Sequence, residues 1–139
     1  MKIISRIKIF IASLLGYSLE RIVNSTETIV PDDGLLRRIL IEPNFIKPDN
    51  KITSFAFKPR RIDKDSLSVD LERLTTHRDA IQNRKKFRLS RLRASIPLSI
   101  GLACIHSPTT EDPAHSLIQG NFTNSVCKKL ATAAELLSI

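Results

Sequence analysis

The sequence predicts a small α+β domain, with a mainly antiparallel sheet, a C-terminal helix and an amphipathic helix at the N-terminus. The length of 139 residues suits a single domain. Short apolar runs alternate with segments rich in Pro, Asn, Asp and Gly, as is typical of antiparallel strands and their turns. Apolar residues recur with helical spacing near both ends of the chain.

Residues 1–23 have the pattern of a basic amphipathic helix. Its apolar stripe recurs at three- and four-residue spacing and comprises Ile3, Ile4, Ile7, Phe10, Ile11, Leu14, Leu15 and Ile22. A signal peptide is disfavoured because no small-x-small cleavage site follows, and the apolar run is too short and too charged to span a membrane. We therefore expect an appendage that packs on the domain, binds a partner protein through residues 3–22, or lies on a membrane surface.

A polar segment, residues 24–34, predicts a linker to a compact domain over residues 35–139. The first strand is expected at 35–41, where Glu42-Pro43 ends the pairing. A second strand is expected at 51–58, with Thr53, Phe55 and Phe57 on one face. The pattern of residues 60–74 fits either a helical turn or a short strand.

Residues 77–93 form the most basic segment of the chain. Seven basic residues and one acid give this segment +6 of the net charge of +8. Such a density of charge predicts a loop or frayed helix outside the core, which we call the basic segment.

The C-terminal part predicts two strands and a helix. A strand is expected at 98–105, and a hairpin through 106–115 leads to a short strand at 116–119. Residues 121–124 offer an N-cap for the final helix. Its apolar face is expected to comprise Val126, Leu130, Ala133 and Leu137.

The net charge and the sequence pI near 9.9 favour anionic partners, either nucleic acid or an acidic protein. In the basic segment, the side chains expected to contact phosphates or carboxylates, without sequence specificity, are Arg84, Lys85, Lys86, Arg88, Arg91 and Arg93. Only Phe87 is interleaved with them, which gives little support for stacking on the bases of a single strand.

Signatures of catalysis are absent from the sequence. It has no Gly-rich phosphate loop, no Gly-x-Ser-x-Gly and no His-Glu-x-x-His. Neither a cofactor nor a metal is expected, since the histidines and cysteines lack ligand spacing. Cys104 and Cys127 are expected to be buried free thiols, as in a reducing cytosol, and we expect a cytoplasmic protein.

The chemistry-bearing residues that remain cluster in the predicted hairpin: His106, Glu111, Asp112 and His115. A histidine near a carboxylate can act as a general acid or base. Alternatively, His115 fixes the hairpin by bonding to the backbone while Asp112 caps the turn at Pro113. The sequence leaves both interpretations open.

Leu-Ser-Val-Asp at 67–70 and Asp-Pro-Ala-His-Ser-Leu-Ile-Gln-Gly at 112–120, followed by Lys-Lys-Leu-Ala, resemble a family of small bacterial proteins with no established activity. The resemblance covers residues 34–137 and implies that residues 1–30 are an appendage. A second resemblance, to the layout of ADP-ribosyltransferase-like folds, implies a site made of an arginine (Arg37 or Arg38), Ser54, and Glu111 or His115.

Two functional hypotheses follow. The first is a small basic bacterial protein that acts by binding, with nucleic acid or another protein as partner and no catalysis. The alternative is a small enzyme acting on an anionic substrate, with the candidate catalytic residues Arg37, Arg38, Ser54, Asp112 and His115. The enzyme hypothesis requires an arginine, Ser54 and His115 to converge on one pocket.

Overall fold

A computed structural model describes residues 26–138 of the chain. The predicted N-terminal helix, residues 1–23, lies outside the described residues, as does the start of the predicted linker. Within residues 26–138, no helix has both the length and the apolar character needed to cross a membrane.

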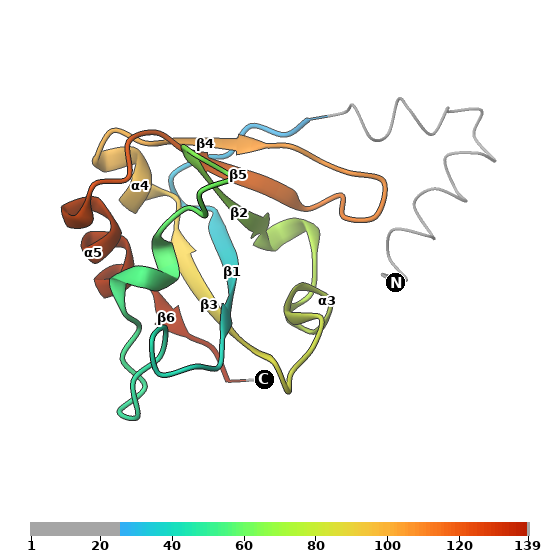
Figure 1. The fold of residues 1–139 in the computed structure, drawn as a ribbon. Coiled ribbons are helices and arrows are strands. Elements are labelled where there is room, and N and C mark those ends of the chain that lie inside the picture. The colour runs from blue at the N-terminus through green and yellow to red at the C-terminus, as the bar shows by residue number, and fades with distance from the viewer. Residues whose placement is uncertain (1–25, 139) are drawn as a thin grey trace.

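The described part of the chain is built around an antiparallel sheet of six strands (Figure 1). Their order across the sheet is β4-β5-β2-β1-β3-β6, and every neighbouring pair is antiparallel. The strands are β1 (Gly34–Leu40), β2 (Ser66–Leu71), β3 (Phe87–Arg93), β4 (Ala103–His106), β5 (His115–Gln119) and β6 (Glu135–Leu136). The predicted α+β class with a mainly antiparallel sheet is therefore confirmed, as is the C-terminal helix.

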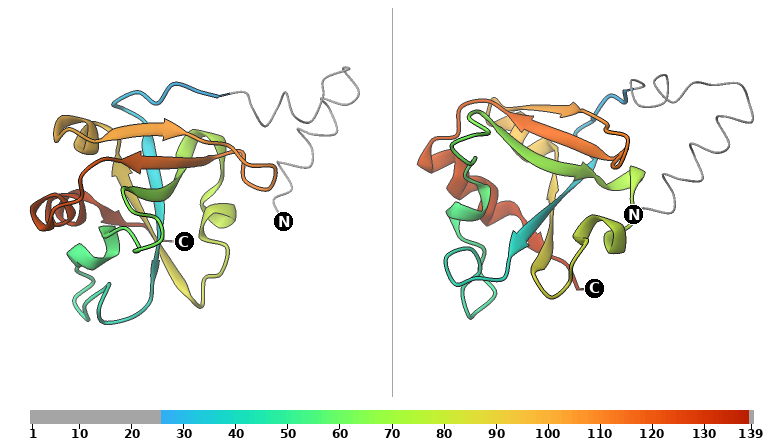
Figure 2. Two further views of the ribbon diagram at one scale, coloured as in Figure 1. Left: turned by 45° about the horizontal axis from the view of Figure 1, so that its top comes forward. Right: turned by 45° about the vertical axis from the view of Figure 1, so that its right-hand side comes forward.

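Helices cover both faces of the sheet (Figures 1 and 2). On one face lie α4 (Ser95–Ser99), α5 (Asn124–Ala133) and the 3-10 helix η1 (Ser54–Phe57), and on the other lies α3 (His77–Ile81). A second 3-10 helix, η2 (Glu72–Leu74), directly follows β2.

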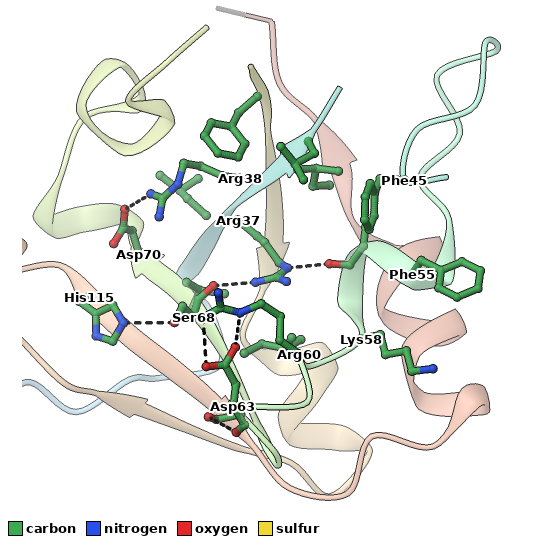
Figure 3. Close-up of a pocket in the computed structure, with 18 residues that line it drawn as sticks. Arg37, Arg38, Phe45, Phe55, Lys58, Arg60, Asp63, Ser68, Asp70 and His115 are labelled. Carbon is green, nitrogen blue, oxygen red and sulfur yellow. Dashed lines mark hydrogen bonds and ion pairs between the residues drawn. The ribbon is translucent and has the colours of Figure 1, made fainter. Parts of the chain in front are cut away.

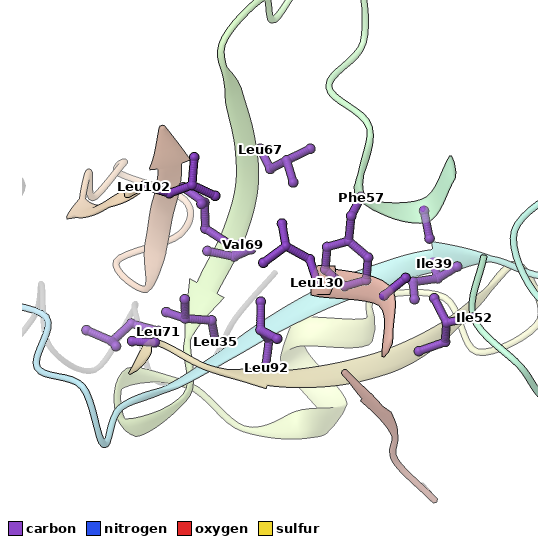
Figure 4. Packing of buried hydrophobic residues seen from close by; sticks show 14 residues of the cluster. Leu35, Ile39, Ile52, Phe57, Leu67, Val69, Leu71, Leu92, Leu102 and Leu130 are labelled. Atoms are coloured by element: carbon purple, nitrogen blue, oxygen red, sulfur yellow. The ribbon is translucent and has the colours of Figure 1, made fainter. Parts of the chain in front are cut away.

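The main core lies between the sheet and α5 (Figure 4). Alternate residues of β2, namely Leu67, Val69 and Leu71, are buried in it, while Ser68 is exposed on the opposite face. From the helical side, Phe57 and Leu130 complete this core. A smaller cluster beneath α3 contains Leu36, Ala80, Ile81 and Leu89.

The predicted strand at 51–58 is wrong. Ile52 forms only an isolated bridge with Ile46, and the chain then enters η1. The adjacent residues Ala56 and Phe57 are both buried whereas Phe55 is exposed, which a helical turn allows and the two-residue period of a strand does not. The turn thus directs Phe55 away from the core.

The prediction that the basic segment lies outside the core is also wrong. Thr76 caps α3 by accepting a hydrogen bond from the Asp79 amide, and β3 then pairs with β1 along its whole length. Leu89 and Leu92 of β3 are buried on opposite faces of the sheet. The strand was not predicted because arginines alternate with these leucines and make the segment look too charged for a core strand.

The C-terminal predictions need smaller corrections. The expected strand at 98–105 begins only at Ala103, because α4 occupies the preceding residues, but the β4–β5 hairpin forms as expected. The final helix is capped by Thr123 and buries Cys127, Leu130 and Ala131. Two members of the predicted apolar face are wrong: Ala133 is exposed, and Leu137 lies beyond the end of the helix.

Candidate functional site

Strands β1 and β2 diverge and leave a gap in the sheet. β1 follows β3 from Gly34 to Leu40 but pairs with β2 only at Leu35 and Leu36. Beyond that point, β2 stays with β5. A pocket of about 410 Å³ lies at the gap, lined by residues of β1, β2, η1 and the loops beside them (Figure 3).

Arg37 bridges the diverging strands. Its Nε donates to the Ala56 carbonyl at 2.7 Å and its Nη1 donates to the Ser68 carbonyl at 2.9 Å (Figure 3). Its guanidinium also lies 5.8 Å from the centre of the Phe57 ring. Burial lowers the pKa of Arg37 to about 10, so the group remains a cation at neutral pH. Among residues 26–138, no carboxylate forms an ion pair with it.

Three more cations line the pocket: Arg38, Lys58 and Arg60. Arg38 donates to the Ala80 carbonyl at 2.8 Å and lies 3.7 Å from the Asp70 carboxylate. Arg60 forms an exposed ion pair with Asp63 at 2.6 Å, and this hydrogen bond raises the pKa of Arg60. With Asp63 and Asp70 as its acids, the pocket lining carries a net positive charge.

Aromatic side chains from three segments line the same pocket: Phe45, Phe55 and Phe87. Phe55 is 59% exposed, and the Lys58 ammonium lies 5.8 Å from the centre of its ring. Figure 3 shows Phe55 at the outer side of the pocket, next to Lys58. At the far end of β1, the Lys86 ammonium lies 5.3 Å from the Phe87 ring. The pocket therefore combines cations with accessible aromatic surface.

His115 lines the pocket from β5. Its Nδ1 lies 2.9 Å from the Ser107 carbonyl, and its Nε2 lies 3.3 Å from Oγ of Ser68. A carbonyl can only accept a hydrogen bond, so Nδ1 carries a proton, and in the neutral ring the lone pair of Nε2 faces the Ser68 hydroxyl. This arrangement is a serine next to a histidine of defined tautomer.

The candidate catalytic residues converge in part. Arg37, Arg38 and His115 line the pocket, whereas Ser54 at the start of η1 does not. Asp112 accepts a hydrogen bond from the Ala114 amide at 3.1 Å, which is the expected cap of the turn. Sequence reasoning overlooked Ser68, although its alternation with Leu67 and Val69 was a signal that it lies on the open face of β2.

The cations expected to bind in the basic segment are divided between two places. Arg84, Lys85 and Lys86 are exposed in the turn between α3 and β3, and Arg88 lies 3.4 Å from the Asn50 side chain. At the other end of β3, Arg91 is ion-paired with Glu72 and Glu135, while Arg93 is exposed. None of these six side chains lines the pocket, and the turn adjoins it only through Phe87.

A second pocket, of about 490 Å³, lies around Glu72. Arg91 and His77 both donate to its carboxylate, at 2.8 Å and 2.7 Å. Partial burial acts to raise the pKa of Glu72, but these two hydrogen bonds outweigh it and hold the pKa below its usual value. The charges of Glu72, Arg91 and Glu135 in this pocket are paired with one another, so these three side chains offer little to a ligand.

Neither cysteine is in a disulfide: Cys104 is half-buried and Cys127 is buried. Burial raises the pKa of the Cys104 thiol to about 11 and also raises that of Cys127, which makes both thiols poor nucleophiles at neutral pH. Within residues 26–138, no three His, Cys, Asp or Glu side chains are grouped so that they could hold a metal ion.

No protein-family model, curated protein or solved structure matches the chain. The resemblance to small bacterial proteins therefore stays a prediction. The pocket between β1 and β2 is the feature from which a function can be inferred.

Proposed function

We propose that this small basic protein binds single-stranded nucleic acid at the pocket between β1 and β2. The observation that carries the proposal is the position of Phe55, whose exposed ring lies at a pocket lined by four cations. Large exposed aromatic rings beside cations are typical of surfaces that stack bases and neutralise phosphates.

The cations supply the attraction to phosphate. Arg37 has no carboxylate partner among the described residues, and Lys58 is exposed with its ammonium against the Phe55 ring. Arg38 and Arg60 are partly neutralised by Asp70 and Asp63, so they contribute less. Phosphate contacts of this kind provide affinity and salt dependence without sequence specificity.

Phe55 supplies a platform for a base. Its ring is not used in the core, since the adjacent Ala56 and Phe57 fill that role. Phe45 and Phe87 offer further apolar surface in the same pocket. Because every base has an apolar face, stacking tolerates any sequence.

The turn between α3 and β3 extends the cationic surface. Lys85 and Lys86 are exposed there, and Lys86 lies over the Phe87 ring that also lines the pocket. We infer that a strand whose base stacks on Phe55 has its neighbouring phosphates along this turn.

Fluorescence anisotropy with labelled single-stranded DNA and RNA tests the proposal. Replacing Phe55 by Ala is expected to weaken binding by roughly 5- to 150-fold, the usual value of one stacked base. The matched control is Ile62→Ala, because Ile62 is 80% exposed and does not line the pocket. The proposal is contradicted if Phe55→Ala and Ile62→Ala weaken binding equally. It is also contradicted if the wild-type protein binds neither single-stranded DNA nor single-stranded RNA at low salt.

A salt titration separates the phosphate contacts. The double replacement Lys85→Gln and Lys86→Gln is expected to reduce the slope of log K against log salt by about 0.7 for each phosphate that the turn no longer neutralises. Exposed lysines on α5 provide the control, as Lys128→Gln and Lys129→Gln. If the slope is unchanged in the variant with Lys85→Gln and Lys86→Gln, the turn does not contact phosphates.

The remaining expectations about partners stay predictions. A partner protein or membrane surface bound through residues 3–22 concerns residues outside the described part of the chain. Cytoplasmic localisation likewise stays a prediction.

A further inference from the structure

We propose that Ser68 is a nucleophile, activated by His115, that accepts a phosphoryl group from a phosphate monoester bound in the pocket between β1 and β2. This inference goes beyond nucleic-acid binding and does not depend on it. It rests on the geometry of the serine and the histidine and on the charge of the pocket around them.

The serine and the histidine have the arrangement that proton transfer needs. Nε2 of His115 lies 3.3 Å from Oγ of Ser68, and Nδ1 lies 2.9 Å from the Ser107 carbonyl, which selects the tautomer of the neutral ring whose Nε2 can accept a proton. A nucleophilic hydroxyl next to a base that a third group orients is the general design of covalent catalysis. Here a backbone carbonyl is the orienting group.

The strands hold the pair in place. Ser68 is in β2 and His115 is in β5, and these strands pair from Ser66↔Gln119 to Asp70↔His115. Arg37 fixes the other edge of β2 by donating to the carbonyl of Ser68 itself. Ser68 is nevertheless exposed, so a substrate can reach its hydroxyl.

The charge of the pocket selects the substrate class. A phosphate monoester is a dianion, and the cations Arg37, Arg38, Lys58 and Arg60 line the pocket that contains Ser68. Arg37 uses two of its N–H groups on carbonyls, and the other groups have no acceptor within residues 26–138. Guanidinium groups stabilise the equatorial oxygens of a phosphoryl group in transfer.

The reaction has two balanced steps. In the first, Oγ of Ser68 forms a bond to phosphorus and the bond from phosphorus to the ester oxygen breaks. His115 takes the Ser68 proton on Nε2 and gives it to the departing oxygen, so an alcohol and phosphoserine result. In the second, a water oxygen forms a bond to phosphorus and the bond from phosphorus to Oγ of Ser68 breaks. His115 takes a proton from the water and gives it to Oγ, so inorganic phosphate is released and Ser68 is restored.

The test uses the full chain with p-nitrophenyl phosphate. Acid quenching and peptide mass spectrometry are expected to find one phosphoryl group on Ser68, and absorbance is expected to show release of p-nitrophenol. Ser68→Ala is expected to abolish both signals, and His115→Gln is expected to slow the release by about 100- to 10,000-fold. Ser99→Ala is the control, because its hydroxyl bonds to the Ile96 carbonyl outside the pocket.

A separate measurement distinguishes a base from a structural histidine. Imidazole added to His115→Ala is expected to restore part of the rate, which a merely structural role would not permit. The inference is overturned if Ser68 of the wild-type protein carries no phosphoryl group after the reaction. It is also overturned if the His115→Gln variant releases p-nitrophenol as fast as the wild type. Either result leaves the anisotropy experiment on Phe55 unaffected, so the two proposals fail separately.

Discussion

The guanidinium of Arg37 donates to the carbonyl oxygen of Ser68 across two strands that no longer pair with each other. The bond, 2.9 Å long, replaces a ladder bond that the divergence of β1 and β2 removes. A backbone carbonyl that has no ladder partner needs another donor, so the side chain satisfies the backbone and at the same time places a positive charge beside the pocket. One residue thus bridges the two strands and places its charge in the pocket lining.

Replacing Arg37 by Met is expected to lower the free energy of unfolding by about 1–3 kcal/mol, because the carbonyls of Ala56 and Ser68 are each left without this donor. Urea denaturation measures this change. Lys58→Met is the control, since it removes a charge from the same pocket without a hydrogen bond to the backbone. Equal stability of the two variants would contradict the bridging role.

Acid is expected to destabilise the protein through Glu72. The pKa of Glu72 in the folded protein lies below its ordinary value of 4.5, so the ionised carboxylate stabilises the fold at neutral pH. That stabilisation begins to fall as the pH drops past about 4.5 and disappears once the folded-state carboxylate is protonated. Thermal melts of Glu72→Gln at pH 7 and pH 3 are expected to show a smaller difference than wild-type melts. Glu42→Gln, at an exposed position, should retain the wild-type difference.

His106 is expected to anchor the start of the described chain. It is 6% exposed, its Nδ1 accepts a hydrogen bond from the Glu27 amide at 2.8 Å, and its Nε2 donates to the Pro113 carbonyl at 2.7 Å. His106→Leu should lower the free energy of unfolding by about 1–3 kcal/mol. It should also speed hydrogen exchange at the Glu27 amide. The Asp33 amide, which bonds to Val30, serves as the internal reference and should exchange as before.

Gly120 is expected to resist substitution more than Gly101. Both have positive φ, +147° and +87°, which side chains rarely adopt. A Cβ at Gly120 would lie 2.5 Å from Cδ2 of the buried Leu102, whereas nothing lies within 4 Å of one at Gly101. Urea denaturation should show a destabilisation of about 2–4 kcal/mol for Gly120→Ala, and about 1–2 kcal/mol for Gly101→Ala. The opposite order would contradict the packing at Leu102.

Local patterns made several elements predictable. The run of apolar residues ending at Glu42-Pro43 predicted β1, and the capping residues before the last apolar period predicted α5. Both signals depend on neighbours within a few residues. The expected turn cap by Asp112 is local in the same sense, since its partner is the amide of Ala114.

Other elements were misread because long-range pairing outweighs local charge. β3 carries three arginines, yet it forms the longest pairing of the sheet, with β1, and buries Leu89 and Leu92. Phe55 was expected on the same strand face as Phe57, but the turn of η1 buries Ala56 and Phe57 in the core and leaves Phe55 exposed. A residue's neighbours in sequence could not show which side of the core it would face.

By itself, the sequence determined part of the candidate site: a basic protein, arginines in the first strand, and His115 in a hairpin, but neither Ser68 nor the exposed ring of Phe55. Only the tertiary structure decided which of these residues meet. The divergence of β1 from β2 brings Arg37 to Ser68, and the pairing of β2 with β5 brings His115 to the same hydroxyl. Such contacts join residues more than 30 positions apart, and they are fixed by burial of Leu67, Val69 and Ile118 on the far face of the sheet rather than by any local preference.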